Sequence, residues 1–140
     1  MLFRSGKRLL EVLEKYYVSD LGIRHALIGY KTEDIAGMLE NVVYLELKRR
    51  GYRVYVGKYE DKEIDFIAEL NGQLLYVQVC YLLESEKVIE REFDVLLEIK
   101  DNFPKYVVSL DEVFGENRQG VKWMNIRDFL LTTKIGRAHV

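Results

Sequence analysis

Hydrophobic and polar positions alternate most clearly across residues 63–81. Two arms rich in β-branched and aromatic residues flank Asn71 and Gly72, a pair that supplies the positive backbone angles of a tight turn. The pattern therefore predicts a β-hairpin. The rest of the chain is arranged around this segment, with a helical pattern on either side of it.

Side chains on a strand alternate between its two faces. Asp65 should therefore point away from Ile64 and Phe66, and Gln78 should share a face with Cys80. A purely structural hairpin does not require an acid in mid-strand opposite a polar pair. These positions are the first candidates for chemistry.

Two helices are predicted on either side of the hairpin. The first begins at Thr32, which can cap it, and ends before Gly51. Its interior is apolar around most of the circumference, which indicates burial on nearly all sides, and Glu40 lies inside that apolar zone. The second helix covers residues 86–101 and carries its apolar residues on one face.

Shorter patterns complete the chain. The order of helix, three strands, helix and strand predicts an α/β fold with a mixed sheet flanked by helices. Residues 1–31 are expected to be a mainly helical segment. The remaining expected elements are helices at 5–15, 21–28 and 126–131 and strands at 52–56, 105–110 and 121–124.

Composition narrows the class of protein. The chain has 140 residues, enough for one domain with an ordinary core, and a formal net charge of -2, which argues against a dedicated phosphate-backbone binder. No apolar run approaches the roughly 20 residues needed to cross a bilayer, and no signal-peptide pattern opens the chain. The single cysteine, Cys80, fits a reducing compartment, so a cytoplasmic location is expected.

The last seven residues, 134–140, differ in character from the rest. They resemble one reading frame of a common sequencing adapter. We therefore expect the natural sequence to break off near Thr133, and His139 is excluded from functional reasoning.

Four positions suggest metal-dependent chemistry on phosphodiesters. Such cleavage needs hard oxygen ligands that hold Mg²⁺ and lower the pKa of a bound water, often with a lysine nearby. One known arrangement combines an acid on a buried helix, an acid on a strand, and Glu-x-Lys on the neighbouring strand. Here the corresponding frame is Glu40, Asp65 and the stretch 78–80.

This frame resembles the restriction-endonuclease-like superfamily of PD-(D/E)XK nucleases. More closely, the chain is similar to the uncharacterised C-terminal domain of bacterial and archaeal AAA+-type ATP-binding proteins. The segments that carry the likeness are KYY at 15–17, DLG at 20–22, LENVVY at 39–44, RRGY at 49–52, KEIDF at 62–66, YVQV at 76–79, EREF at 90–93 and DNFPKY at 101–106.

The resemblance implies a restriction-endonuclease-like mixed sheet in residues 32–133, with 1–31 leading from an ATPase region that this chain lacks. It also implies that the ATPase module of the parent protein is a partner. No ATP site is expected in this chain. Nucleic acid and a second copy of the chain are further candidate partners, and no membrane partner is expected.

The chain departs from the nuclease pattern at two positions. Asp65 matches the strand acid and Glu40 the helix acid, but Gln78 stands where the pattern has a carboxylate and Cys80 where it has lysine. An amide is a poorer Mg²⁺ ligand than a carboxylate, and cysteine supplies no positive charge. Glu40, Asp65 and Gln78 are the candidate ligands if Mg²⁺ binds at all.

A replacement cation could come from the second helix, where Lys87 and Arg91 are the candidates. We nevertheless expect a degenerate, inactive site in a domain that works by binding. The alternatives are an active Mg²⁺-dependent DNA endonuclease and a structural module without nucleic-acid affinity. The run 48–50 is expected to be a solvated helix end and is the best candidate for a phosphate contact.

Overall fold

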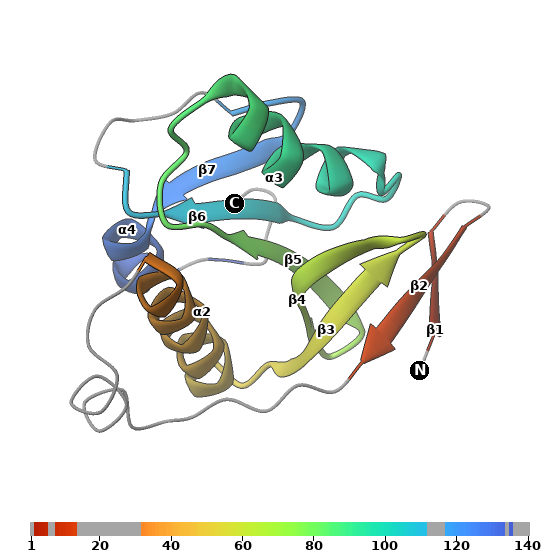
Figure 1. Ribbon diagram of the computed structural model, residues 1–140. Coiled ribbons are helices and arrows are strands. Elements are labelled where there is room, and N and C mark those ends of the chain that lie inside the picture. Colours follow the sequence, from red (N-terminus) through yellow and green to blue (C-terminus); the bar gives the residue numbers. More distant parts are fainter. Residues whose placement is uncertain (1, 6–7, 14–31, 112–116, 134, 136–140) are drawn as a thin grey trace.

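Seven strands form one mixed sheet with helices on both of its faces in the computed structural model (Figure 1). The structure describes residues 2–5, 8–13, 32–111, 117–133 and 135. The strands follow one another across the sheet in chain order. They are β1 (Leu2–Ser5), β2 (Arg8–Leu13), β3 (Arg53–Tyr59), β4 (Lys62–Leu70), β5 (Gln73–Val79), β6 (Lys105–Ser109) and β7 (Val121–Asn125).

The type of strand pairing changes once across the sheet. The strands from β1 to β5 pair antiparallel, whereas β5 with β6 and β6 with β7 pair parallel. A parallel pair needs a crossover, and helix α3 (Glu86–Glu98) supplies it between β5 and β6. The predicted hairpin is confirmed as β4 and β5, with φ of 53° at Asn71 and 81° at Gly72.

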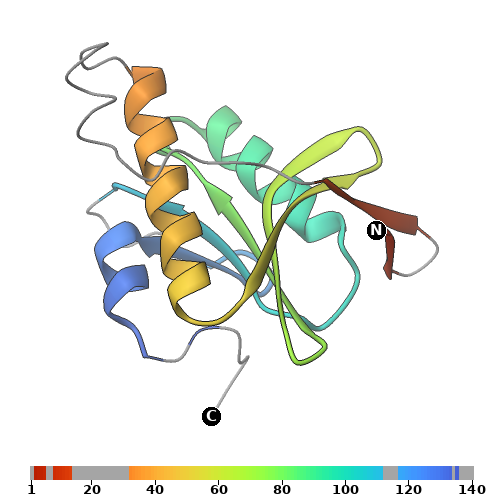
Figure 2. The same cartoon turned by 90° about the horizontal axis from the view of Figure 1, so that it is seen from below.

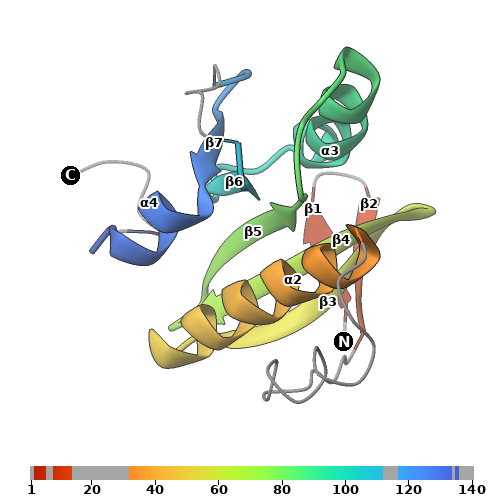
Figure 3. The same ribbon diagram turned by 60° about the vertical axis from the view of Figure 1, so that its left-hand side comes forward.

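The sheet separates the core into two layers, and helices cover each layer (Figures 2 and 3). Helices α2 (Thr32–Arg49) and α4 (Ile126–Leu131) pack on one face, where Val43 and Phe129 are fully buried against Phe66 and its neighbours. Helix α3 covers the opposite face through residues such as Phe93 and Leu96. The α/β prediction, a mixed sheet flanked by helices, is confirmed.

Strand β4 carries one extra residue where it pairs with β3. Tyr55 faces Ile67 and Gly57 faces Ile64, so three steps on β4 match two on β3. Such a β-bulge breaks the alternation of side chains. Ile64 consequently belongs to the core under α3 and Phe66 to the core under α2, so the prediction that they share a face was wrong.

Arg50 joins the end of α2 to the end of α4. Its guanidinium pairs with Glu46 at 2.5 Å and donates to the carbonyl oxygens of Phe129 at 3.0 Å and Thr132 at 2.6 Å. Hydrogen bonds from Arg49, first, and from Arg50 lower the pKa of Glu46. Arg50 therefore satisfies carbonyls that a helix end leaves unpaired, and it is committed to the fold rather than to phosphate.

The N-terminal segment differs from its prediction. Where a helix was expected over residues 5–15, strands β1 and β2 form a hairpin that pairs with β3, Leu13 facing Val56. Strand pairing here overrides a local apolar spacing that also suits a helix. The hairpin belongs to the main sheet, and the expected division between 1–31 and 32–133 stays a prediction. The helix expected at 21–28 lies outside the described residues.

Other boundaries stay close to prediction. Helix α3 ends at Glu98 rather than at residue 101, and its N-cap is the Ser85 hydroxyl, which accepts the Val88 N–H. Within the expected tail of 134–140, Ile135 is the described residue, and it is buried in the core under α2. None of the described helices combines the length and the apolar character that a membrane span requires.

Gly57 should resist any side chain. A β-carbon added there would lie 2.3 Å from Ile67 Cδ1 and 3.3 Å from Ile64 Cβ, both in a filled core. We expect Gly57→Ala to lower the free energy of unfolding by about 1–3 kcal/mol, the usual cost of overpacking. Urea denaturation of the purified chain measures this loss.

The matched control shortens the Ile67 side chain, which the new methyl group would contact. Ile67→Ala will itself be destabilising because it leaves a cavity, but the added methyl at residue 57 should then cost little. The double variant Gly57→Ala with Ile67→Ala should therefore lose less than the two single losses added together. Simple additivity would contradict the close contact.

Candidate functional site

Asp65 and Gln78 lock the diverging ends of β4 and β5 together. The ladder between the two strands ends at Phe66 and Val77, so the next residues are held by side chains instead. Asp65 N donates to the Gln78 Oε1 atom at 2.8 Å, and the Asp65 Oδ2 atom accepts the Val79 N–H at 2.8 Å. Each strand thus binds the other through one backbone and one side-chain group.

Asp65, one of the two residues that exchange these hydrogen bonds, lies within the β-bulge. An inserted residue bends its strand and redirects a side chain, and such bulges are frequent beside active sites. Gln78 is buried and Asp65 half-buried, so polar groups are concentrated where the sheet opens. The structure brings the Asp65 backbone N–H into contact with the Gln78 side chain.

Cys80 lies directly after β5, at the same end of the sheet. Its backbone N–H donates to the Val108 carbonyl at 2.9 Å, and its thiol lies 3.2 Å from the Leu82 carbonyl. Burial, followed by the negative charge of Glu92, raises the pKa of the thiol to about 11, and Arg91 opposes this shift. At neutral pH Cys80 is therefore an uncharged thiol and a weak nucleophile.

Glu92 is a site residue that the sequence reasoning missed. Burial raises its pKa above the ordinary range; Arg91 lowers it and the charge of Glu40 raises it further. Glu92 thus lies within electrostatic reach of both Glu40 on α2 and Cys80 after β5. An available signal was its spacing, because Glu92 follows Ile89 by three residues on the apolar face of α3.

The two candidates for a replacement cation, Arg91 and Lys87 on α3, differ in their surroundings. Arg91 pairs with Glu92 at 3.6 Å and its charge acts on Cys80, although 70% of its side chain is exposed. Lys87 is exposed in the first turn of the helix. The proximity of the carboxylate of Glu40 to that of Asp65 stays a prediction.

A second polar network closes the neighbouring end of β6. Asp111 Oδ2 accepts the Ser109 hydroxyl at 2.7 Å and the Leu83 N–H at 2.8 Å, while Trp123 Nε1 donates to Ser109 Oγ at 3.0 Å. Asn125 donates to the Asp111 carbonyl at 2.9 Å. The network fixes the loop that follows Cys80, and it was not predicted because its members come from segments distant in sequence.

Mg²⁺ demands near-octahedral oxygen ligands, and the donors here are partly engaged by the fold. The Gln78 oxygen accepts an N–H from Asp65, and one Asp65 oxygen accepts the N–H of Val79. In the described ranges, no three His, Cys, Asp or Glu side chains gather into a metal-binding group. This donor set falls short of what Mg²⁺ requires.

The exchange between Asp65 and Gln78 should be worth measurable stability. Asp65→Ala leaves the buried Val79 N–H without its acceptor, which costs about 1–3 kcal/mol, whereas Asp65→Asn keeps an acceptor and should cost less. Gln78→Ala should likewise destabilise. Urea denaturation of each single variant measures its loss, and an unchanged free energy of unfolding in Asp65→Ala or Gln78→Ala would contradict the lock.

Comparison with known proteins adds one relative. The chain is 40% identical over 126 residues to an uncharacterised protein of Haemophilus influenzae, an alignment that covers 90% of this chain and 31% of the relative. No family model matches the chain, and no solved structure matches it either. The chain is therefore similar to a region of a bacterial protein and spans about a third of that protein's length.

Proposed function

We propose that this chain is a nuclease-fold accessory domain, the C-terminal part of a cytoplasmic AAA+-type ATP-binding protein, whose degenerate site no longer cleaves phosphodiesters. Its work is then to bind, with the ATPase module of the parent protein as the first partner. The single observation that carries the proposal is the lock between Asp65 and Gln78. At the positions where the nuclease pattern has metal-binding groups, these residues form hydrogen bonds between β4 and β5.

The order of elements supports the nuclease-fold part of the proposal. Helix α2 precedes the strands β3, β4 and β5, and α3 then leads to the parallel strand β6. This is the order of helix, three strands, helix and strand that the sequence predicts for a nuclease-like domain. The strand acid Asp65 and the position of Gln78 meet at the open end of the hairpin, as that frame requires.

Charge supports the loss of cleavage. Negative groups act on residue 80 from two sides, Glu92 and Asp111, while the nearby cation, Arg91, is largely exposed. Stabilising a phosphodiester transition state needs positive charge held against the reacting oxygens. The neutral thiol of Cys80 does not provide it.

Exposed apolar side chains support a binding role. Leu131 is 72% exposed at the end of α4, and Leu45 is 40% exposed on α2, the helix beside it. A pocket of about 410 Å³ lies nearby, lined by Arg49, Tyr52 and Leu131 among others. The Haemophilus influenzae relative is about three times as long as the matched region, so its remainder is a natural candidate to cover this surface.

An active Mg²⁺-dependent DNA endonuclease is the second candidate, and one observation favours it. Arg91 is placed where its charge reaches Cys80, so it could stand in for the missing lysine. A cleavage assay separates the two functions.

We expect wild-type protein to leave supercoiled plasmid intact in Mg²⁺ or Mn²⁺. The variant Gln78→Glu with Cys80→Lys should gain metal-dependent nicking, because glutamate keeps an acceptor for the Asp65 N–H and lysine adds the missing charge. Agarose gels report nicked and linear products over time.

The control adds Asp65→Asn to the repaired variant and should abolish the gained activity. Nicking by the wild-type chain that disappears in Asp65→Asn would overturn the degenerate site. A repaired variant that folds but stays inactive would count against the nuclease fold, whatever the chain binds.

Binding is tested by mixing this chain with the part of the Haemophilus influenzae relative that lies outside the match. We expect a complex on size-exclusion chromatography, and Leu131→Asp should weaken it about tenfold or more if Leu131 lies at its centre. Glu90→Ala, an exposed change on α3, is the control and should leave affinity unchanged.

Two other outcomes would indicate a different function for the domain. Salt-sensitive DNA binding without a protein complex would move the domain to nucleic acid, because counterion release gives that dependence. If the chain binds neither the protein partner nor DNA, it is a structural module, and the proposal is contradicted.

A further inference from the structure

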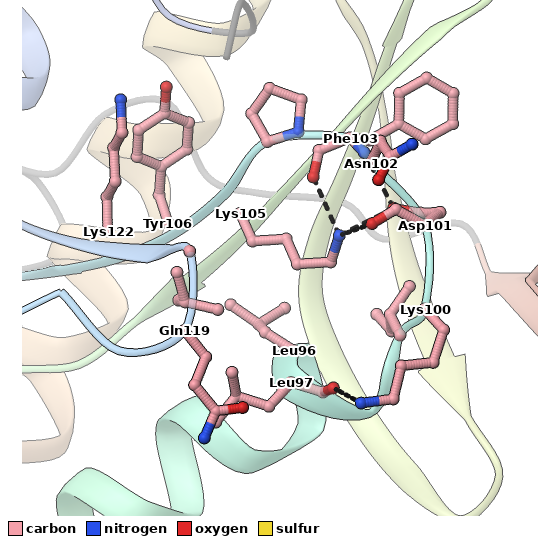
Figure 4. A pocket seen from close by; sticks show the side chains of 14 residues that line it. Leu96, Leu97, Lys100, Asp101, Asn102, Phe103, Lys105, Tyr106, Gln119 and Lys122 are labelled. Atoms are coloured by element: carbon pink, nitrogen blue, oxygen red, sulfur yellow. Dashed lines mark hydrogen bonds and ion pairs between the residues drawn. The ribbon is translucent and has the colours of Figure 1, made fainter.

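A pocket of about 680 Å³ lies at the start of β6 and β7, apart from the candidate site (Figure 4). Its lining comes from the end of α3, the segment 100–106 and the turn at 119–122, and none of the candidate site residues takes part. Ligand pockets usually enclose about 300–1,000 Å³. The size therefore suits a small organic molecule.

A buried ion pair forms one wall. The Lys105 ammonium donates to Asp101 Oδ1 at 2.7 Å and to the carbonyls of Asp101 and Phe103 at 3.0 and 2.9 Å, as Figure 4 shows. The other Asp101 oxygen accepts the Tyr76 hydroxyl at 2.6 Å, and burial, with this hydrogen bond, raises the pKa of Tyr76. Asp101 and Lys105 neutralise each other, so this wall carries no net charge.

Two further lysines line the pocket with unbalanced charge. Lys122 lies with its ammonium 6.0 Å from the centre of the Tyr106 ring, and Lys100 donates to the Leu97 carbonyl at the end of α3. Within the described part of the chain, neither ammonium is paired with a carboxylate. The pocket is thus locally positive in a chain whose formal net charge is -2.

Apolar surface completes the pocket. Leu97, Phe103 and Pro104 are half-buried there, so each presents part of its side chain to the pocket or to solvent. An apolar body that covers them removes hydrophobic area from water. A ligand with only an anionic group would leave this surface uncovered, and one with only an apolar body would leave the lysines without a partner.

We propose that this pocket binds a small organic anion: a phosphate, sulfonate or carboxylate group attracted by the exposed lysines at its two sides, Lys100 and Lys122, joined to a flat apolar body that packs on the apolar lining. This binding is independent of the proposed function. It requires neither the parent ATPase nor the Asp65 site.

A matched pair of dyes tests both halves of the argument. 8-Anilinonaphthalene-1-sulfonate carries the anion and the aromatic body, whereas N-phenyl-1-naphthylamine has the same body without the sulfonate. We expect the sulfonate to bind the folded chain more tightly than the neutral dye, with binding weakened by added salt. Fluorescence titration gives both dissociation constants, and inorganic sulfate alone should not compete at equal concentration.

The double variant Lys100→Met with Lys122→Met should weaken sulfonate binding about fivefold to tenfold and leave the neutral dye unchanged. Lys87→Met, which removes an exposed lysine outside the pocket, is the control for overall charge and should change neither. Far-ultraviolet circular dichroism establishes that each variant is folded.

Three results would overturn the proposal: equal affinity for the two dyes, sulfonate binding that survives the double lysine variant, or an equal loss of binding in Lys87→Met. Each would show that the dye does not use these lysines as a site. Because these measurements need neither DNA nor a protein partner, their failure is distinguishable from failure of the proposed function.

Discussion

The packing of an extra residue into β4 is the constraint on which the candidate site depends. Ile64 and Phe66 fill opposite cores only because the bulge lies between them, and Gly57 lacks a side chain where Ile67 needs the space. The bulge coincides with the end of the ladder to β5. Buried N–H groups there require acceptors, which side chains of the two strands supply to each other.

Under the proposed function, this arrangement explains how residues at nuclease-like positions serve the fold instead of cleavage. The negative charges of Glu92 and Asp111 act on Cys80, and the charge of Glu40 acts on Glu92. The positive charge of Arg91 opposes them from an exposed position. A carboxylate at 78 would add another negative charge to this group. A neutral amide at Gln78 keeps the hydrogen bond without that repulsion, so stability alone is a sufficient reason to retain it.

The sequence predicted the elements with strong local signals and missed those decided by distant contacts. The hairpin turn at Asn71 and Gly72 and the apolar stripe of α3 are local, and both were predicted correctly. The N-terminal strands depend on pairing with β3, which no local spacing reveals. In the site, the nuclease-like frame linked Asp65 with Gln78. Glu92 was missed because it joins the site through helix packing, and the bulge that sets the local geometry leaves no mark in a strand pattern.

The contacts of Arg50 bear on how the chain reaches its native state. This side chain joins the close of one helix to carbonyls about eighty residues later, so the layer formed by α2 and α4 depends on a long-range closure. Such contacts form late, because their loop-closure entropy is offset only when the intervening sheet is in place. During synthesis, the part of α2 that packs on α4 would stay uncovered until residue 132 had emerged, an interval in which a holding chaperone would shield it.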